Sequence, residues 1–561
     1  MFSVVEYPRM NLEISVKNYR CFNELHPASL RIHRGTTALI GANNAGKSSL
    51  LRMFYEFRPL FALLADDPRN WIRLLNESIP LPQPLEVQDR EAVFHRHAKG
   101  DLVINIRVRD CDYTRRKPDP YPYLVPGEVD LVISRKNGQA RARLDGQRGR
   151  FQLVDAKGSH ARLTGGESTL VTISWPVLQD LFASLADTLY IGPYRALRAY
   201  PEEDHSYDIQ LGATFFRKFL RVHETEKARF DQGARRLEKD MRGIFQFKKF
   251  EVLVEGTPPA LYFSINGERN RVDELGSGIG QVFLILAHAY LLRPAYVFID
   301  EPECHLHPSI QAEFVTALNG YTRKALFLAT HSMGLARSAG DRIYQVARHV
   351  SDLYTTVLPY KPEERLSEVL GEINFSVQQQ AGCRKILLVE GPTEVKAVRQ
   401  FLRHVGHDRE IIIIPLGGSS MINGHRDDEL MEIARICPDV FAIIDSEKPS
   451  SNSLLSAERQ GFLKSCQKAG IVCHVLERRS LESYLTRPAI QKVLGKGFQE
   501  LGHFDDVKRR YGHWPKSDNW KIVREMSLKD FQDSDLGKYL RYLVEAPCKV
   551  PPPSPQGKPE L

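Results

Sequence analysis

The pattern of apolar and polar positions divides the chain into strand-like and helical stretches. Residues 11–19 alternate as a half-buried strand does, and residues 36–41 form a short apolar run that leads into a glycine-rich loop. Residues 209–246 are charged and follow a helical period, whereas residues 295–300 form the strongly apolar run of a buried strand. Strands and helices in this order predict an α/β fold.

A second set of strands and helices begins after a break near residues 374–384. Apolar runs of strand length occur at 385–389, 411–414 and 441–444, and a helical pattern separates the first two. We therefore predict a first domain at residues 1–375 with insertions within 56–250, a second domain at 376–545, and a proline-rich tail at 546–561 that we expect to be disordered.

Composition and charge narrow the class of protein only modestly. Apolar residues make up 42% and charged residues 26% of the chain, as in ordinary globular proteins. No run approaches the roughly 20 apolar residues of a membrane span, and charges near the start replace the apolar core of a signal peptide, so we expect a cytoplasmic protein with no membrane partner. The 8 cysteines form no CxxC pair, and the net charge of +8 permits a nucleic-acid partner without indicating one.

The glycine-rich loop carries a phosphate-binding motif. Residues 41–48 read GANNAGKS and match G-x-x-x-x-G-K-[ST] between a predicted strand and a predicted helix. In such a loop backbone N–H groups cradle phosphate oxygens, the lysine reaches the β and γ phosphates, and the serine ligates Mg²⁺. We therefore predict ATP with Mg²⁺ as a cofactor. The residues assigned to nucleotide binding are Gly41, Asn43, Asn44, Gly46, Lys47, Ser48 and Ser49.

Two later apolar strands end in side chains suited to nucleotide hydrolysis. We assign Asp300, at the end of one strand, to the nucleotide's metal ion and Glu301 to polarising the attacking water. The next strand ends before His331, which we expect to contact the γ-phosphate or the water. Residues 303–307 include three possible zinc ligands, but no second cluster at metal-site spacing accompanies them, so zinc is not favoured.

A serine- and glycine-rich segment at 275–281 opens a predicted helix between the loop and the acidic pair. With it, the chain resembles the ATP-binding-cassette ATPases of the structural-maintenance (SMC) and DNA-repair type. In that family the segment binds the γ-phosphate held by a second head. The resemblance therefore implies that Ser277 and Gly278 contact ATP across a dimer, although the inserted Ile279 departs from the transporter form of the motif.

Acidic residues also follow the strands predicted in the second domain. Glu390 follows the first strand, and Asp445 and Glu447 follow a later one, where open α/β sheets bind their ligands. Glu394 stands at the start of the intervening helix, and a glycine-rich turn lies at 417–419. Carboxylates gathered without basic neighbours repel one another unless a cation neutralises them, so we predict Mg²⁺, with Mn²⁺ as an alternative. The simpler interpretation, that these acids cap helices, stays open.

This arrangement resembles the Toprim domain of topoisomerases, primases and certain nucleases, which has Glu-Gly after one strand and Asp-x-Asp after a later one. Here the second motif is Asp-Ser-Glu, which leaves the number of metal ions open. Glu482 is a candidate additional ligand, and nothing in the sequence activates Tyr484 as a nucleophile, so a topoisomerase is not favoured. The candidates to hold a scissile phosphate are Arg478, Arg479, Lys516 and Lys521.

An ATPase of this type followed by a Toprim domain is similar to the OLD (overcoming lysogenisation defect) family of nucleases over about residues 11–500. The run YIGPYR at 190–195 also resembles a segment of that family and places Arg195 near the nucleotide. The resemblance implies ATP-regulated, metal-dependent cleavage or nicking of DNA, often in bacterial defence against phage, with a second defence component in some relatives. It also implies a homodimer or larger homo-oligomer, with possible contacts from residues 200–246.

The sequence therefore predicts an ABC/SMC-like P-loop ATPase with a helical insertion, followed by a smaller Rossmann-like Toprim domain, acting as an ATPase and endonuclease. Two alternatives stay open: an ATP-driven DNA sensor or clamp that does not cleave, and a nuclease that acts on RNA such as tRNA. Basic runs at 115–117, 141–150 and 508–510 either contact nucleic acid or are solvated surface. The predicted catalytic residues are Glu301, His331, Glu390, Asp445 and Glu447, and the predicted metal ligands are Ser48, Asp300, Glu390, Glu394, Asp445, Glu447 and Glu482.

Overall fold

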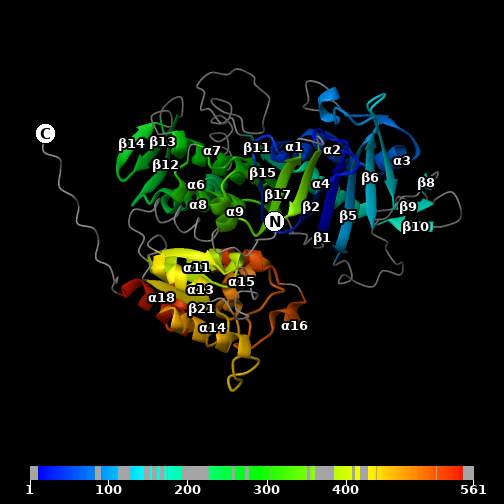
Figure 1. Ribbon diagram of the computed structural model, residues 1–561. Helices are drawn as coiled ribbons and strands as arrows, with labels where there is room; N and C mark the ends of the chain where they lie inside the picture. The colour runs from blue at the N-terminus through cyan, green and yellow to red at the C-terminus, as the bar shows by residue number, and fades with distance from the viewer. Residues whose placement is uncertain are drawn as a thin grey trace. The chain divides into compact units, whose positions relative to one another are not determined.

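The computed structural model divides into two compact units (Figure 1). The first unit is Met1–Ser332 with Arg342–Tyr360, and the second is Met333–Asp341 with Lys361–Leu561. The structure describes residues 10–82, 90–111, 127–144, 152–153, 161–164, 170–173, 175–192, 227–255, 260–271, 277–304, 306–349, 354–360, 385–406, 411–416, 427–436, 439–512 and 514–546. The predicted break at 374–384 and the tail from residue 547 lie outside these ranges, as do the basic run at 115–117 and Arg195.

A six-stranded sheet forms the centre of the first unit. In spatial order its strands are β11 (Thr188–Ile191), β15 (Tyr296–Asp300), β16 (Ala325–Thr330), β3 (Gly35–Ile40), β17 (Arg342–His349) and β18 (Tyr354–Pro359). All neighbours are parallel except β17 and β18. Asp300 pairs with Ala329, and Thr330 pairs with Ile40, so three strands end at the same edge, where the predicted nucleotide residues follow them.

Helices cover this sheet because its inner strands are apolar along their whole length. Every residue of β16 is buried, as a parallel strand covered on both faces requires. Helix α1 (Lys47–Glu56) follows β3 and stacks Phe54 on Phe298, with ring centroids 4.5 Å apart. The unit also contains α6 (Lys227–Phe245), α7 (Ser277–Leu292), α8 (Pro308–Asn319) and a small sheet of β12 (Phe250–Glu255), β13 (Ala260–Ile265) and β14 (Glu268–Arg271). Of the described helices, none is both long enough and apolar enough to cross a membrane.

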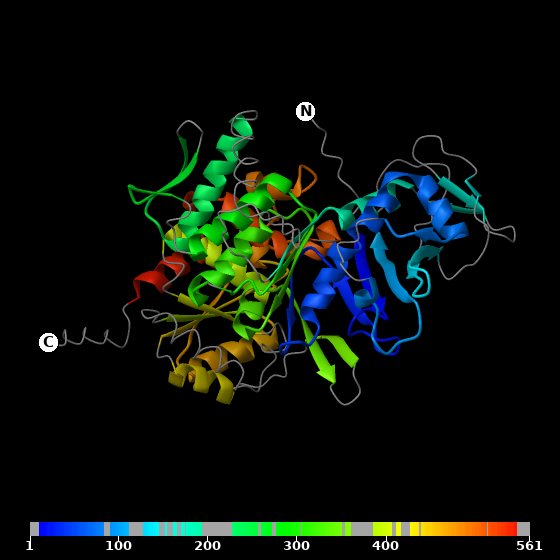
Figure 2. The same cartoon turned by 90° about the horizontal axis from the view of Figure 1, so that it is seen from above.

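An antiparallel sheet shares its apolar core with the central sheet. In spatial order its strands are β2 (Ala28–Ile32), β1 (Met10–Lys17), β5 (Leu102–Cys111), β6 (Glu128–Ile133), β7 (Gln139–Leu144) and β4 (Ile79–Pro80). Helices α2 (Arg58–Asp66), α3 (Pro68–Asn76) and α4 (Trp175–Ala186) accompany it (Figure 2). Trp71 of α3 contacts Phe182 of α4 edge to face at 5.0 Å. Short elements complete this part: η1 (Arg90–Val93), β8 (Gln152–Leu153), β9 (Ala161–Thr164) and β10 (Leu170–Ile173).

A four-stranded parallel sheet forms the second unit. In spatial order its strands are β20 (Ile411–Pro415), β19 (Lys385–Val389), β21 (Val440–Ile444) and β22 (Val472–Val475). Leu387 and Val389 face one apolar cluster, and Ile386 and Leu388 face another, which explains why the strand is a continuous apolar run. Both units therefore confirm the predicted α/β class.

Helices cover both faces of this sheet. They are α9 (Met333–Ala339), α11 (Pro392–Val405), α13 (Asp427–Ile436), α14 (Ala457–Lys468), α15 (Arg487–Leu494), α16 (Val507–Tyr511), α17 (Asn519–Glu525) and α18 (Asp535–Glu545), with the short η3 (Leu481–Tyr484), η4 (Lys516–Asp518) and η5 (Leu528–Asp530). Although α9 precedes β17 in the chain, it belongs to the second unit and packs on α11. Lys396 of α11 binds Asp341, just after α9, through a buried ion pair of 2.9 Å.

Candidate functional site

The phosphate-binding motif forms the loop between β3 and α1. Gly46 caps α1 with a φ of 109°, and a Cβ at this position would lie 2.5 Å from Cys21 Sγ. A Cβ on Gly41 would lie 2.1 Å from the backbone oxygen of Val346. Since such approaches exclude every residue with a side chain, the two motif glycines are required by the packing of the loop.

Lys47 folds over this loop. Its Nζ donates hydrogen bonds to the backbone oxygens of Gly41 (2.8 Å) and Ala42 (2.9 Å), and it lies 3.3 Å from His331 Nε2. Burial lowers the pKa of Lys47, although the three acids that follow β15 oppose this effect. An ammonium that donates to loop carbonyls can exchange them for phosphate oxygens.

The predicted hydrolytic residues lie together at the ends of β15 and β16. Asp300 is buried, with 1% of its surface exposed. Glu301 adopts a left-handed φ of 48°, and its N–H donates to the oxygen of Ala329 at 2.8 Å. His331 Nε2 lies 3.4 Å from Glu301 Oε1. Lys47, His331 and Glu301 thus form a continuous row beside Asp300.

Glu303 is a residue of this site to which the sequence analysis assigned no role. Its Oε1 accepts hydrogen bonds from Thr330 Oγ1 (2.6 Å) and from the N–H of His331 (2.9 Å). Glu303 therefore ties the segment after β15 to the segment after β16 and positions His331. The neighbouring Cys304 donates its thiol to Glu301 Oε2 at 3.2 Å, and the residue after it lies outside the described residues.

The remaining residues predicted to bind the nucleotide lie in the phosphate-binding loop, at the start of α1 or at the start of α7. Arg348 donates to the backbone oxygen of Asn44 at 3.4 Å. Helix α7 begins at Ser277, but the side chain of Ser277 and the residues before it lie outside the described part, so its contact across a dimer stays a prediction. Asn43 and Asn44 are exposed, whereas Ser48, Ser49 and Gly278 are half-buried.

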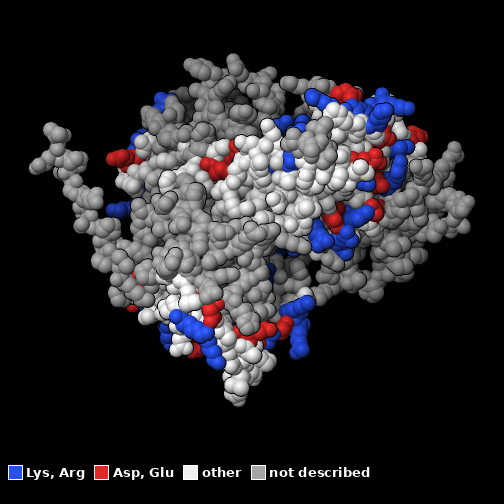
Figure 3. Space-filling view, viewed as in Figure 1, with Lys and Arg blue, Asp and Glu red and all other residues white. Residues whose placement is uncertain are grey.

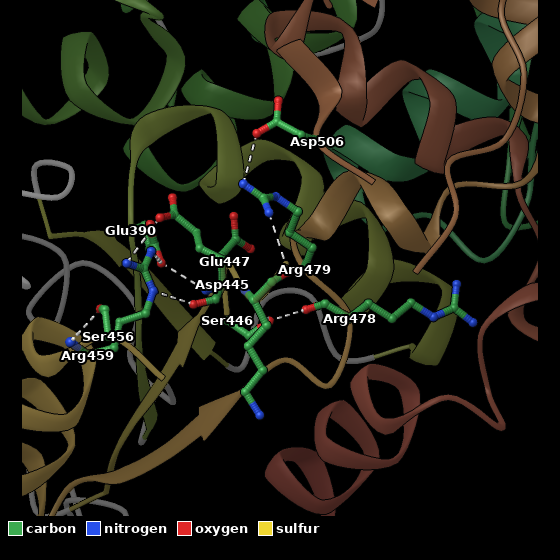
Figure 4. Close-up of polar contacts among 10 residues, drawn as sticks. Glu390, Asp445, Ser446, Glu447, Ser456, Arg459, Arg478, Arg479 and Asp506 are labelled. Carbon is green, nitrogen blue, oxygen red and sulfur yellow. Dashed lines mark hydrogen bonds and ion pairs between the residues drawn. The ribbon is translucent and has the colours of Figure 1, made fainter. Parts of the chain in front are cut away.

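The carboxylates predicted in the second unit gather at the carboxyl ends of β19 and β21 (Figure 4). Glu390 Oε1 accepts from the N–H of Asp445 at 2.8 Å, and Asp445 Oδ1 accepts from the N–H of Leu481 at 3.0 Å. Burial raises the pKa of Asp445 well above its usual value, and the charges of Glu482 and Glu390 add to this effect. Burial also raises the pKa of Glu390, against the opposing charge of a nearby arginine.

Glu482 joins the cluster from η3. Its Oε1 accepts from Asn519 Nδ2 at 3.0 Å and lies 3.4 Å from Lys516 Nζ. Burial disfavours its ionised form, but the charge of Lys516 together with polar groups of Ser480, Asn519 and the backbone outweighs burial, so the pKa of Glu482 is lowered. Its Oε2 is buried and has no hydrogen-bond partner of acceptable geometry among the described residues. An ionised, unpartnered oxygen near Asp445 is a suitable ligand for a hard divalent cation.

The other two candidate ligands lie at the margin of this cluster. Glu394 stands in the first turn of α11, accepts from Thr393 Oγ1 at 3.1 Å, and contributes to the raised pKa of both Glu390 and Asp445. The Glu447 side chain is 59% exposed. The glycine-rich turn at 417–419 lies outside the described residues. Within the described ranges, no three Asp, Glu, His or Cys side chains are already gathered in a metal-binding group.

The expectation that these carboxylates lack basic neighbours is wrong. Arg459 of α14 is buried, with its Nη2 3.3 Å from Glu390 Oε1 and its Nη1 3.3 Å from Glu447 Oε2 (Figure 4). Its Nε donates to the backbone oxygen of Asp445 at 2.7 Å. Together with Lys516 beside Glu482, Arg459 supplies positive charge that the sequence pattern did not reveal.

Tyr484 is held in a structural role. Its hydroxyl donates to Asp535 Oδ1 at 2.6 Å and accepts from the N–H of Arg478 at 3.2 Å. Burial and the negative charge of Asp535 raise the pKa of Tyr484, which is the opposite of what a nucleophile requires.

The basic candidates near this site are engaged within the second unit. Arg478 lies over the Tyr484 ring, with its guanidinium carbon 4.6 Å from the ring centroid. Arg479 binds Asp506 at 2.8 Å, and Lys521 binds Asp518 at 3.2 Å. A phosphate would therefore compete with existing partners for these side chains.

Charges on the antiparallel sheet of the first unit are mixed (Figure 3). Arg109 pairs with Glu13 at 2.6 Å. Arg141, the first residue of a predicted basic run, lies 3.5 Å from Asp101. Part of the positive charge is thus already neutralised locally, which favours a solvated surface for this portion of the run.

Comparison with known proteins supports an ATPase domain. A family model described as "AAA domain, putative AbiEii toxin, Type IV TA system" matches residues 184–337, which include α7, Asp300, Glu301 and His331. The chain is 25% identical to Endonuclease GajA of Bacillus cereus (strain VD045) over 172 residues, 28% of this chain and 29% of GajA. It is 36% identical to the "Putative phosphonates utilization ATP-binding protein PhnK" of Escherichia coli (strain K12) over 80 residues, 13% of this chain and 32% of PhnK.

The chain thus spans about three tenths of the length of each of these two relatives. Among solved structures, the SMC head domain from Thermotoga maritima covers 63% of this chain and 99% of its own, at 12% identity and a TM-score of 0.34. An SmcHead bound to the C-winged helix domain of ScpA covers 64% and 99%, at 12% identity and a TM-score of 0.36. At these scores the solved structures carry no argument about function.

Proposed function

We propose that the chain binds and hydrolyses ATP at the loop between β3 and α1, and that ATP regulates metal-dependent cleavage of nucleic acid at the carboxylate cluster. One observation carries this proposal: a single chain holds both the row of Lys47, His331 and Glu301 beside buried Asp300 and the buried oxygens of Asp445 and Glu482. Each set has the chemistry of phosphate transfer, and the two lie in different units.

The first set supports the ATPase half of the proposal. Lys47 exchanges its loop carbonyls for the β and γ phosphates, while the Ser48 hydroxyl and Asp300 hold the nucleotide's Mg²⁺. Glu301 orients the attacking water, and His331 lies within reach of both Glu301 and Lys47. The family match over residues 184–337 supports the same activity.

The second set supports the nuclease half. When bound, Mg²⁺ or Mn²⁺ would activate water and stabilise the leaving oxygen of a phosphodiester. Asp445 and Glu482 would hold the ion, because both are buried and the Oε2 of Glu482 has no hydrogen-bond partner among the described residues. Lys516 favours the ionised form of Glu482 and provides positive charge for a phosphate. The similarity to Endonuclease GajA supports cleavage.

The chain path supports regulation by ATP. Helix α9 begins two residues after His331 and packs on α11, whose first turn carries Glu394. The buried ion pair of Lys396 with Asp341 fastens the end of α9 to α11. A change at His331 when ATP is hydrolysed therefore has a short covalent route to the helix that borders the carboxylates.

We further propose that the second unit is a Toprim domain and that the chain is an OLD-type nuclease of bacterial anti-phage defence. The parallel sheet with Glu390 after β19 and Asp445 after β21 supports the Toprim assignment. A homodimer or larger homo-oligomer, in which Ser277 completes the ATP site of another copy, follows from the resemblance to two-headed ATPases. We propose a second defence component as a further partner of this assembly.

A second function, an ATP-driven DNA sensor or clamp that does not cleave, is favoured by one observation. Arg459 already neutralises Glu390 and Glu447, so the cluster is partly compensated without a metal ion. Such a protein would bind DNA through the second unit and leave it intact.

Incubation with supercoiled plasmid and with tRNA, each in Mg²⁺ or Mn²⁺, separates these functions. The nuclease proposal expects plasmid nicking that EDTA abolishes and that Glu390→Ala reduces at least about 100-fold. Glu500→Ala, which removes an exposed acid of the same unit, is the matched control and should cleave normally. Cleavage of tRNA alone would change the substrate class, and no cleavage of either would favour the sensor.

A further inference from the structure

Arg459 is the feature of the carboxylate cluster that the proposed mechanism leaves unexplained. It is 3% exposed, and its guanidinium touches three parts of the cluster: Glu390, Glu447 and the backbone of Asp445. A buried arginine is costly unless carboxylates pair with it, and the carboxylates are costly unless a cation pairs with them. Each therefore stabilises the other at this position.

The two cations of the cluster pair with different carboxylates. Arg459 pairs with Glu390 and Glu447 (Figure 4). Glu482, in turn, has Lys516 3.4 Å from its Oε1, while its Oε2 has no hydrogen-bond partner among the described residues. The guanidinium thus already neutralises negative charge on Glu390 and Glu447, whereas the buried oxygen without a partner belongs to Glu482.

We propose that Arg459 takes the place of one of two cations, so that the second unit binds a single divalent ion, held by Asp445 and Glu482. This inference rests on the proposed metal site and specifies how many ions it holds. Arg459 is then a positioning residue: it binds Glu390, whose Oε1 accepts from the N–H of Asp445, and it holds the backbone oxygen of Asp445 through its Nε.

The position of Arg459 in α14 makes this arrangement rigid. Ser456 caps α14 and accepts from the N–H of Arg459 at 3.3 Å, so the backbone of the arginine belongs to the first helical turn. Phe462 and Cys466 of the same helix are buried in the apolar cluster under the sheet. The backbone of Arg459 is anchored in this way, and a second ion would have to displace its guanidinium from Glu390, Glu447 and the backbone oxygen of Asp445.

The number of bound ions is tested by titrating the nucleotide-free full chain with Mn²⁺. The titration is monitored by calorimetry and by the electron paramagnetic resonance signal of free Mn²⁺. The wild type should bind about one ion per chain that Asp445→Asn eliminates, whereas Asp300→Asn should not change the count. Arg459→Met should bind about two ions, and its melting temperature without metal should fall and recover with Mn²⁺ by more than in the wild type. Arg459→Lys, which keeps the charge, should stay near one ion.

Lys385→Met is the matched control. Lys385 is a buried cation at the opposite end of β19, where its Nζ donates to the backbone oxygens of Leu543 and Val544. Its loss should lower the melting temperature without changing the Mn²⁺ count. If Arg459→Met does not fold, its bound ions cannot be counted. The numbers of Mn²⁺ ions bound by the wild type and by Arg459→Lys then decide whether the second unit holds one ion.

Two outcomes would overturn the inference in distinguishable ways. Two ions in the wild type that both depend on Asp445 would leave the metal site standing and refute the role given to Arg459. An unchanged count in folded Arg459→Met would refute it as well. No ion that depends on Asp445 would refute the metal site itself, and the proposed nuclease with it.

Discussion

Glu303→Ala should lower the rate of ATP hydrolysis without weakening ATP binding. Glu303 Oε1 accepts one hydrogen bond from the Thr330 hydroxyl and one from the N–H of His331, whereas it acts on Lys47 of the phosphate loop through its charge. The substitution therefore releases the segment that carries His331 and leaves Lys47 in place.

The size of the effect follows from these two bonds. Hydrogen bonds to a charged acceptor contribute about 1.5–3 kcal/mol each. Part of that free energy stabilises the folded state and does not lower the barrier to ATP hydrolysis. A loss of about 2–4 kcal/mol from the transition state corresponds to a kcat about 30- to 1000-fold lower. Glu303→Gln keeps an acceptor oxygen and should lose only about five- to tenfold, since it removes the charge alone.

Steady-state ATPase measurements with a fluorescent-nucleotide binding assay separate kcat from affinity. We expect kcat to fall in the order wild type, Glu303→Gln, Glu303→Ala, with the nucleotide Kd within about threefold of the wild type. A kcat within threefold of the wild type for Glu303→Ala would refute the role given to Glu303, and so would a change confined to KM.

Three further predictions concern other parts of the chain. Lys47→Ala should weaken ATP binding at least about tenfold in the same nucleotide-binding assay, because it removes the ammonium of the phosphate loop. Asp535, whose pKa is lowered from 3.8 to about 2 by His474, by a backbone N–H and by Tyr484 in spite of burial, should stabilise the fold above about pH 4 and lose that effect as pH falls through about 2. Asp535→Asn should thus lower the free energy of unfolding in urea by about 1–2 kcal/mol at pH 7, and by progressively less on acidification. An equal loss at pH 7 and at about pH 2 would contradict this. Tyr484→Phe should cleave within about threefold of the wild type while costing about 1 kcal/mol of stability, whereas abolished cleavage would indicate a nucleophile.

Residues that follow directly from a strand or loop pattern were predictable. The loop at 41–48 needs only the strand before it and the helix after it, and both elements are present as predicted. Asp300 and His331 were placed at one edge because neighbouring parallel strands end together. Glu390 and Asp445 meet for the same reason in the second unit.

Residues whose roles depend on tertiary packing were not predictable. Arg459 lies in the first turn of α14, where a charged residue is typical of a solvated helix start, and only the packing of α14 turns it toward Glu390. Glu303 received no role from the sequence because its partner, His331, follows another strand. The nine-residue helix α2 went unrecognised, since a short apolar run fits a strand and a buried helix equally well.

Cleavage of supercoiled plasmid by Asp445→Asn tests the central claim most directly. Asp445 is 8% exposed, borders both Glu390 and Glu482, and lies in a different unit from the ATP loop. The account predicts that Asp445→Asn hydrolyses ATP at the wild-type rate but nicks plasmid at least about 100-fold more slowly in Mg²⁺ or Mn²⁺. Nicking by Asp445→Asn at the wild-type rate would contradict the account.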